Sequence, residues 1–224
     1  MTVEQNRTAV ARFDRWARTY DDGQRKPWFL RGQAAALDAA GLQEDDRLLD
    51  VGCGTGSAVI AAARRPVARA CGIDVSPEMI VRARRNADGL AGVEFRVADA
   101  EAIPYPDATF TAVICTNSFH HYSEPLRALA ELRRVLAPGG RLVVLDPDRA
   151  GCLWVWCWDR ILRVAERSHV RYYTAAELLD LVRTGGFADV RLLAADHGHW
   201  RHGKIGWASA LIRGDHRPRE GGRS

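Results

Sequence analysis

The sequence predicts an α/β fold: a Rossmann-like, seven-stranded, mostly parallel sheet with a C-terminal antiparallel hairpin and helices on both faces. Apolar, strand-like segments alternate with helical segments through residues 47–148. The first strand runs into a turn with three glycines, and four strands end in an aspartate, at Asp50, Asp74, Asp99 and Asp146. Alternating strands and helices form right-handed βαβ units, in which ligands bind beyond the carboxyl ends of the strands.

Length and composition fit one globular domain. The chain has 224 residues, of which 47% are hydrophobic and 27% charged, and we expect one domain over residues 1–214 followed by a disordered tail over residues 215–224. The apolar runs are too short to span a bilayer and the N-terminus lacks a leader pattern, so we expect a cytoplasmic protein. Five scattered cysteines favour reduced thiols in the core over disulfides or a metal site.

Helical spacing and capping residues place the elements in order. Phe13, Trp16 and Tyr20 recur at helical spacing, and an alanine-rich helix begins at Pro27 and ends at Gly41. Further helices are expected over residues 57–63, 76–87, 124–140 and 174–185, the last with a capping box, "TAAE". Strands are expected at residues 48–51, 70–76, 92–100, within 108–122, and at 141–148, 188–196 and 207–214.

The helix expected at residues 124–140 has one apolar face and is followed by two glycines. The glycines at 139 and 140 fit a turn before the fifth strand. The residues expected to line the buried face of this helix are Leu126, Leu129, Leu132, Val135 and Leu136.

The stretch "LLDVGCGTGSA" indicates a ligand-binding corner. Residues 48–51 predict a buried strand and residues 57–63 the start of a helix, so the glycines form the turn between them. The dinucleotide fingerprint G-x-G-x-x-G fails here, because its last position falls on Ser57 or Val59. Asp50 would repel a pyrophosphate and would favour a ligand that carries positive charge.

Four motifs resemble, in order and spacing, those of the class I S-adenosylmethionine-dependent methyltransferases. They are "LLDVGCGTG", "GIDVSPEMI", "VADAEAIPYPDATFTAVICTNSFHHY" and "LRRVLAPGGRLVVLDP". The resemblance is to the type 11 group related to quinone-biosynthesis C-methyltransferases, and it covers residues 48 to about 147. "FDRWARTYDD", residues 13–22, resembles the N-terminal signature of that group. The segment beyond Asp148 is not covered.

The resemblance implies S-adenosylmethionine as the cofactor, held at the tips of the strands. Asp74 would accept the ribose hydroxyls, and Asp99 with Ala100 would meet the adenine. Asp50 and the glycine turn would face the methionine end, although an acid after a strand can also be only a helix cap. The implied cofactor-binding residues are Asp50, Gly52, Cys53, Gly54, Gly56, Asp74, Val75, Met79, Asp99, Ala100 and Asn117.

Methyl transfer requires alignment of the acceptor more than it requires a general base. Where a base is needed, the candidates are His120, His121 and Tyr20, because the histidines follow the fourth strand and titrate near neutral pH. A structural role for the histidine pair is the alternative. No metal site is predicted, since the histidines within residues 197–202 lack a carboxylate or cysteine companion and fit a solvated loop.

The acceptor site is expected in residues 151–173, a tryptophan-rich insertion. Trp154 and Trp158 would share a helical face, and with His169 and Tyr172 they are the candidate substrate residues. Core packing of the tryptophans and peripheral contact with a membrane are the alternatives.

The predicted function is therefore methylation of carbon or oxygen in a small organic acceptor: an apolar or aromatic metabolite, a quinone or a lipid precursor. A nicotinamide oxidoreductase, which the glycine spacing disfavours, and a non-catalytic regulator or partner subunit that binds S-adenosylmethionine stay open. No nucleic-acid partner is expected, because the net charge of +4 is spread over many arginines. "TNSFHH" also stands where methyltransferases of nucleobase amino groups carry an NPPY-like stretch.

Overall fold

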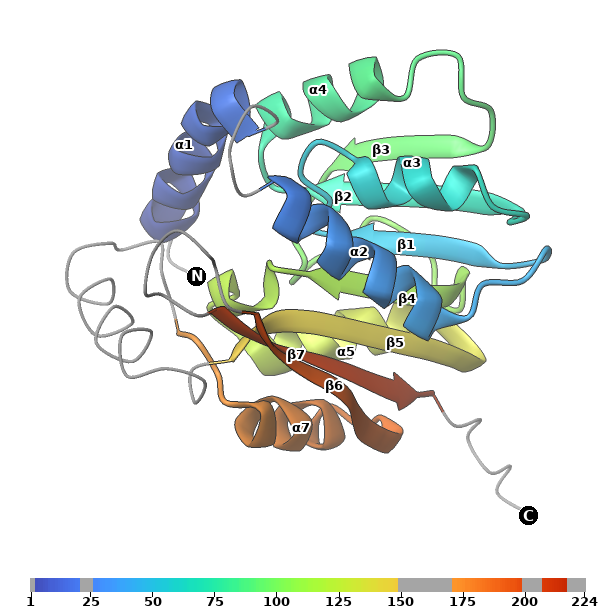
Figure 1. The fold of residues 1–224 in the computed structure, drawn as a ribbon. Coiled ribbons are helices and arrows are strands. Elements are labelled where there is room, and N and C mark those ends of the chain that lie inside the picture. The colour runs from blue at the N-terminus through green and yellow to red at the C-terminus, as the bar shows by residue number, and fades with distance from the viewer. Residues whose placement is uncertain (1–2, 21–25, 149–170, 199–206, 217–224) are drawn as a thin grey trace.

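Seven strands form one sheet in the computed structural model, which describes residues 3–20, 26–148, 171–198 and 207–216 (Figure 1). The strands span Arg47–Val51 (β1), Arg69–Asp74 (β2), Val93–Val97 (β3), Phe110–Thr116 (β4), Leu136–Asp148 (β5), Ala188–Gly198 (β6) and Trp207–Asp215 (β7). Their order in the sheet is β3-β2-β1-β4-β5-β7-β6. Strands β1 to β5 are parallel, and β7 is antiparallel to both β5 and β6.

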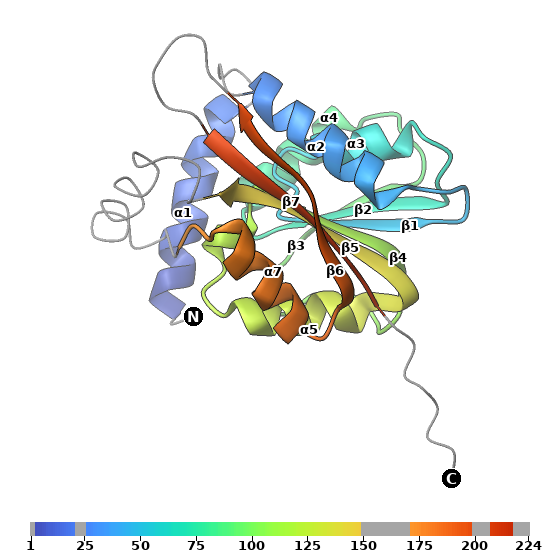
Figure 2. The same cartoon turned by 60° about the horizontal axis from the view of Figure 1, so that its bottom comes forward.

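Helices cover both faces of the sheet. They span Val3–Tyr20 (α1), Lys26–Ala40 (α2), Ser57–Ala63 (α3), Pro77–Asn86 (α4), Pro125–Val135 (α5) and Ala175–Thr184 (α7), with a 3₁₀ turn at Phe119–His121 (η1). Figure 2 shows α2, α3 and α4 on one face and α5 and α7 on the other. Helix α1 packs beside α4, near the carboxyl ends of the strands (Figure 1). The predicted fold class is confirmed, and no helix in the described ranges is long and apolar enough to cross a membrane.

The strands are buried on both sides because helices cover both faces. In β1, Leu49 and Val51 belong to the core cluster that contains residues of α5 and α7, whereas Leu48 belongs to the cluster that contains residues of α2 and α3. This double burial explains why the strands of a parallel sheet are almost continuous apolar runs. Asp50 interrupts that run, and because side chains alternate along a strand, its carboxylate points to the same face as Leu48.

The predicted helix starts are confirmed at both caps. The Ser76 hydroxyl accepts a hydrogen bond from the Met79 amide at 3.2 Å at the start of α4. At the start of α7, the Thr174 hydroxyl accepts from the Glu177 amide at 3.1 Å, and the Glu177 carboxylate accepts from the Thr174 amide at 2.8 Å. Each cap provides a hydrogen-bond partner for amide groups at the start of a helix, which have none within the helix itself.

Two details of α5 and β5 differ from the prediction. Helix α5 ends at Val135 and β5 begins at Leu136, so the pair of glycines at 139–140 lies inside the strand, at a shift in its register with β4. Leu126 is 48% exposed. The buried positions of α5 are Ala128, Leu129, Leu132 and Val135. At 3.6 residues per turn, Leu126 lies roughly 130° from the centre of that stripe, which explains its exposure.

An ionic network ties the start of β1 to β5 and to the end of α2. The buried Asp46 carboxylate accepts a hydrogen bond from the Gln43 amide at 2.6 Å and one from the Thr111 hydroxyl at 2.5 Å, and it pairs with Arg141. Arg141 also donates to the Ala40 carbonyl. Burial raises the pKa of Asp46, but the hydrogen bonds and the Arg141 charge outweigh it, so the pKa lies below the ordinary 3.8.

We expect Asp46→Asn to lower the free energy of unfolding at pH 7 by about 1–3 kcal/mol, because charge-assisted bonds of a buried group are lost. A lowered folded-state pKa stabilises the protein above the unfolded pKa, and this contribution is lost as the pH falls through the folded value. Urea unfolding near pH 7 and near pH 3 measures this. We expect the difference in free energy of unfolding between the natural chain and Asp46→Asn to be smaller near pH 3. Asp45→Asn at the exposed neighbour is the control. An effect of the same size at both pH values would contradict the assignment.

Candidate functional site

A cleft lies at the carboxyl edge of the sheet, where β1, β2, β4 and the segment after β3 end beneath α1. Both its floor and its roof come from segments far apart in the sequence. Its lining residues are Phe13, Trp16, Tyr20, Val51, Gly52, Gly54, Ile73, Asp74, Val75, Met79, Ala98, Asp99, Ala100, Glu101, Thr116, Asn117, Ser118, His121 and Tyr122. It is the site at which a sheet of this topology is expected to bind a ligand.

The turn between β1 and α3 depends on residues without a side chain. Gly52 has a φ of +77°, and a Cβ there would lie 2.5 Å from the Ser118 side chain. A Cβ on Gly56 would lie 2.8 Å from the Phe95 ring and 3.0 Å from Ala83. Gly52 therefore lets the turn approach the segment after β4, and Gly56 lets α3 pack closely on the α4 side of the sheet.

The amide groups of this turn are already engaged within the protein. Those of Gly52 and Cys53 both donate to the Ile73 carbonyl at 2.9 Å. That of Gly54 donates to a carboxylate oxygen of Asp74, also at 2.9 Å. A phosphate group, which binds such turns through their amides, would meet three occupied donors and a carboxylate.

Asp74 ends β2 and reaches across to the glycine turn. Its second oxygen accepts from the Ser76 amide at 2.9 Å, so each oxygen holds one backbone donor. Burial raises the pKa of Asp74, the two amide hydrogen bonds oppose the shift, and the Asp14 charge adds to it, with a raised pKa as the result. An ionised carboxylate has about four acceptor positions, so Asp74 can still accept hydrogen bonds from the cleft.

Asp50 is fully buried in β1, directly behind the lining residue Val51. Neither of its carboxylate oxygens has a hydrogen-bond partner within the described residues. Burial, and then the nearby charge of Asp74, raises the pKa of Asp50 to about 8. A buried polar group without a partner is rare in proteins and needs an explanation, which makes the Asp50 carboxyl group a candidate contact for a ligand.

Asn117 is a second unusual group in the cleft. It follows β4 with a φ of +54°, a conformation that asparagine tolerates better than most residues. Its amide donates to the Leu145 carbonyl at 2.7 Å, which holds the backbone in place. The side-chain oxygen is buried and has no partner within the described residues, so it is available to accept a hydrogen bond from a ligand.

The segment after β3 forms a rigid wall of the cleft. The Glu101 amide donates to the Asp99 carboxylate at 2.9 Å. The buried Glu101 carboxylate then accepts from the Ser123 hydroxyl at 2.9 Å and from the Glu124 amide at 3.0 Å. Glu101 thereby fixes Asp99 and Ala100 relative to the start of α5.

Two adjacent histidines of η1, the turn that follows β4, occupy different environments. The Nδ1 atom of His120 lies 2.9 Å from Oδ1 of Asp146, and both side chains are buried. The His120 ring centroid is 4.7 Å from that of Tyr172 and 3.9 Å from that of His121. His121 instead lines the cleft, where its ring meets Phe13 edge-on at 5.1 Å.

Helix α1 roofs the cleft with aromatic side chains. Phe13, Trp16 and Tyr20 all line it. The Trp16 and Tyr20 rings meet edge-on at 4.8 Å, and Tyr20 stacks on Phe29 of α2 at 5.7 Å. A Cβ on Gly54 would lie 3.7 Å from the Tyr20 hydroxyl, so Tyr20 lies directly over the glycine turn.

Most of the predicted cofactor-binding residues come together in this cleft. Those that line it are Gly52, Gly54, Asp74, Val75, Met79, Asp99, Ala100 and Asn117. Asp50, Cys53 and Gly56 lie behind the lining, where Cys53 is a buried core residue.

The predicted catalytic and substrate residues are less closely grouped. Tyr20 and His121 line the cleft, whereas His120 does not. Tyr172 is buried beside His120. The predicted substrate residues Trp154, Trp158 and His169 lie outside the described residues.

Several lining residues were not predicted from the sequence. Phe13 and Trp16 share the helical stripe of Tyr20, and that spacing could have identified them. Glu101 directly follows the predicted pair at 99–100. Ser118 and Tyr122 had no comparable signal, because their place in the cleft depends on how closely Gly52 approaches the segment after β4.

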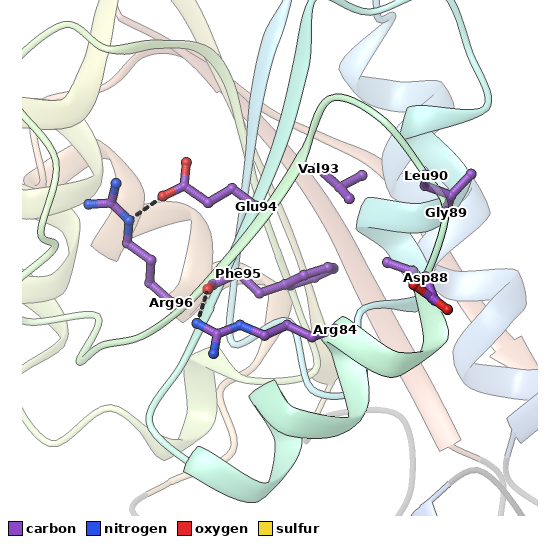
Figure 3. A pocket seen from close by; sticks show the side chains of 9 residues that line it. Arg84, Asp88, Gly89, Leu90, Val93, Glu94, Phe95 and Arg96 are labelled. Carbon is purple, nitrogen blue, oxygen red and sulfur yellow. Dashed lines mark hydrogen bonds and ion pairs between the residues drawn. The ribbon is translucent and has the colours of Figure 1, made fainter.

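A second, more open hollow lies between the end of α4 and β3 (Figure 3). Arg84 donates to the Phe95 carbonyl at 2.7 Å, and Glu94 pairs with both Arg69 and Arg96. These charged groups are already paired within the protein and contribute to the fold, so we assign no ligand to this hollow.

Comparison with known proteins identifies relatives of the central part of the chain. A family model described as "Methyltransferase domain" matches residues 49–144. Demethylmenaquinone methyltransferase of Thermus thermophilus is 45% identical over 120 residues, which are 52% of this chain and 54% of that protein. The 27-O-demethylrifamycin SV methyltransferase of Amycolatopsis mediterranei is 40% identical over 117 residues, 49% of this chain and 43% of that protein. The chain thus spans about half the length of these curated relatives.

The fold is shared with solved structures over most of the described chain. The YcgJ protein from Bacillus subtilis superposes with a TM-score of 0.71 at 20% identity, covering 84% of this chain and 99% of that one. At this level of identity the likeness concerns the fold alone.

In the absence of any ligand, we expect Asp50→Asn to stabilise the protein more at about pH 9 than at about pH 5. The folded protein retains a proton on Asp50 up to about pH 8, whereas an ordinary aspartate loses it near 3.8. The free energy of unfolding of the natural chain therefore falls as the pH rises between these values and is level above them. Asparagine carries no charge, so the free energy of unfolding of the Asp50→Asn variant should fall less as the pH rises.

Urea unfolding at both pH values measures the effect. Asp88→Asn, at an exposed aspartate near the end of α4, is the matched control. A natural chain and an Asp50→Asn variant with the same pH dependence would contradict the raised pKa.

Proposed function

Residues 49–144 belong to the type 11 group of class I S-adenosylmethionine-dependent methyltransferases, and from this premise we propose that the chain methylates carbon or oxygen of a small organic acceptor. The observation that carries the proposal is the buried carboxyl group of Asp50, which has no hydrogen-bond partner in the described ranges, beside a turn in which the amides of Gly52, Cys53 and Gly54 are occupied. A ligand with positive charge would complete this site, whereas a phosphate would not. S-adenosylmethionine, when bound, supplies such charge together with a sulfonium-activated methyl group.

The residues of the cleft fit the cofactor from end to end. Asp74 would accept the two ribose hydroxyls with its remaining acceptor positions. Asp99 and Ala100, on the wall fixed by Glu101, would meet the adenine. Asp50 and the glycine turn would face the methionine end, where the Asn117 side-chain oxygen supplies a further acceptor.

Where the acceptor must lose a proton, we propose a histidine of η1 as the base. His121 faces the cleft and is the better placed of the two histidines to take it. The ring centroids of His120 and His121 lie 3.9 Å apart, so the buried His120–Asp146 pair would support the His121 ring. Tyr20, above the glycine turn, would exclude water and orient the acceptor.

Aromatic lining supports a planar or apolar acceptor. Phe13, Trp16 and Tyr122 present ring surface to the cleft, and such surfaces favour flat, weakly polar molecules. The relatives named for demethylmenaquinone and for 27-O-demethylrifamycin SV support a quinone or a secondary metabolite as the acceptor. The insertion containing Trp154, Trp158 and His169 remains our proposal for the rest of the acceptor site, next to Tyr172.

We expect Asp74→Ala to weaken binding of S-adenosylhomocysteine by about 2–4 kcal/mol, because the ribose hydroxyls and the Gly54 amide lose a charged partner. Isothermal calorimetry measures the affinity, with Asp88→Ala as the control at an exposed site. Unchanged affinity would remove Asp74 from the cofactor site. A natural chain whose melting temperature rises with NAD and not with S-adenosylhomocysteine would contradict the proposed function itself.

We expect His121→Asn to reduce methyl transfer by about 100-fold or more, the usual contribution of a general base, while S-adenosylhomocysteine binding stays the same. Transfer of a labelled methyl group to a panel of demethylated quinones and phenols measures this. His216→Asn is the control, since His216 contacts the Leu136 carbonyl away from the cleft. Equal turnover in both variants would exclude His121 from proton transfer.

A further inference from the structure

Helix α1 is attached to the body of the protein by a polar contact as well as by its aromatic side chains. Asp14 lies on α1 between the lining residues Phe13 and Trp16. Its carboxylate accepts a hydrogen bond from the Ser76 hydroxyl and lies 3.4 Å from the Glu78 amide. The carboxylate therefore sits at the N-terminus of α4, a ten-residue helix whose positive dipole end favours an anion.

The same contact continues into the cofactor site. Ser76 donates its amide to Asp74 at 2.9 Å and its hydroxyl to Asp14. Asp74 in turn accepts from the Gly54 amide at 2.9 Å. An unbroken chain of hydrogen bonds thus links the roof helix, the start of α4, the tip of β2 and the glycine turn.

We propose that Asp14 is a positioning residue that couples the docking of α1 over the cleft to the binding of the cofactor's ribose by Asp74, acting through Ser76. The inference rests on the proposed function and deepens it, because it assigns a role to a residue that does not line the cleft. With Asp14 docked, Ser76 is held so that its amide orients the Asp74 carboxylate. The same contact brings Phe13, Trp16 and Tyr20 over the site.

Linkage makes this coupling measurable in both directions. If docking of α1 raises the affinity for the cofactor, bound cofactor must favour docking of α1 by the same factor. If Asp14 only capped α4, its substitution would lower the free energy of unfolding. It would change neither the affinity for the cofactor nor the effect of bound cofactor on α1. The two roles therefore differ in what ligand binding does to α1.

The test is a double-mutant cycle of Asp14→Ala and Ser76→Ala, with S-adenosylhomocysteine as the probe. We expect Asp14→Ala to weaken its affinity about tenfold, within the usual range of coupling between sites. The double variant should bind S-adenosylhomocysteine no more weakly than the weaker-binding single variant does, because both substitutions interrupt the same series of hydrogen bonds. Asp14→Asn keeps an oxygen that can accept a hydrogen bond from Ser76 and loses only the charge at the N-terminus of α4. We expect this variant to bind S-adenosylhomocysteine about two- to fivefold more weakly than the natural chain does.

Hydrogen exchange at the amides of residues 10–20 provides the second readout. In the natural chain, S-adenosylhomocysteine should slow this exchange. In Asp14→Ala, exchange should be faster without ligand and should not slow when ligand is added. Asp88→Ala, at an exposed aspartate near the other end of α4, should behave as the natural chain in both measurements.

The outcomes separate the two proposals. Asp14→Ala with the affinity and ligand-dependent exchange of the natural chain would overturn the coupling and leave the proposed function intact, as would full additivity in the cycle. Failure of the natural chain itself to bind S-adenosylhomocysteine would overturn the proposed function, and the coupling with it. Asp14→Asn provides the same comparison if Asp14→Ala does not fold.

Discussion

The unpartnered carboxyl group of Asp50 is the constraint on which the rest of the cleft depends. It is held in β1, between β2 and β4, so the backbone cannot move it toward solvent without breaking two ladders of the sheet. An ionised carboxylate in such a place is costly unless it is paired, and the described chain offers it no hydrogen-bond donor. The unliganded protein accommodates it by a raised pKa. A cationic ligand at the neighbouring turn, as we propose, would stabilise the ionised form.

The glycine turn illustrates how one scaffold can hold different ligands. A strand, a glycine turn and a helix form the phosphate site of dinucleotide-binding proteins, where the amides point at the ligand. Here the amides of Gly52 and Cys53 close onto β2, and that of Gly54 closes onto Asp74. The turn consequently presents closely packed backbone and the Asp74 carboxylate, and no set of free amides, to the cleft. Fold alone would not distinguish these cases, whereas the hydrogen-bond partners do.

Local signals in the sequence account for most of the cofactor half of the site. Apolar runs identify the strands, and the acid at the end of each run locates Asp74 and Asp99, because strand tips in a parallel sheet meet at one edge. The signals fail where contact is non-local. Ser118 enters the cleft only because Gly52 has no side chain. The sequence predicts too long a helix at α5, because Leu136 continues its helical spacing. In the structure, Leu136 begins β5, where pairing with β4 determines the conformation.

The cleft divides into halves with different origins, and this has a consequence for specificity. The cofactor half comes from strand tips within residues 49–144, the part that the methyltransferase family model matches. The opposite side of the cleft comes from α1, which precedes that part, and under our proposal it faces the acceptor. Under the proposed function, substitutions in α1 would change the choice of acceptor. The two halves are nevertheless not independent, because Asp14 of α1 reaches Asp74 through Ser76. If the proposed coupling through Asp14 holds, a change of acceptor that shifts α1 also changes the affinity for the cofactor.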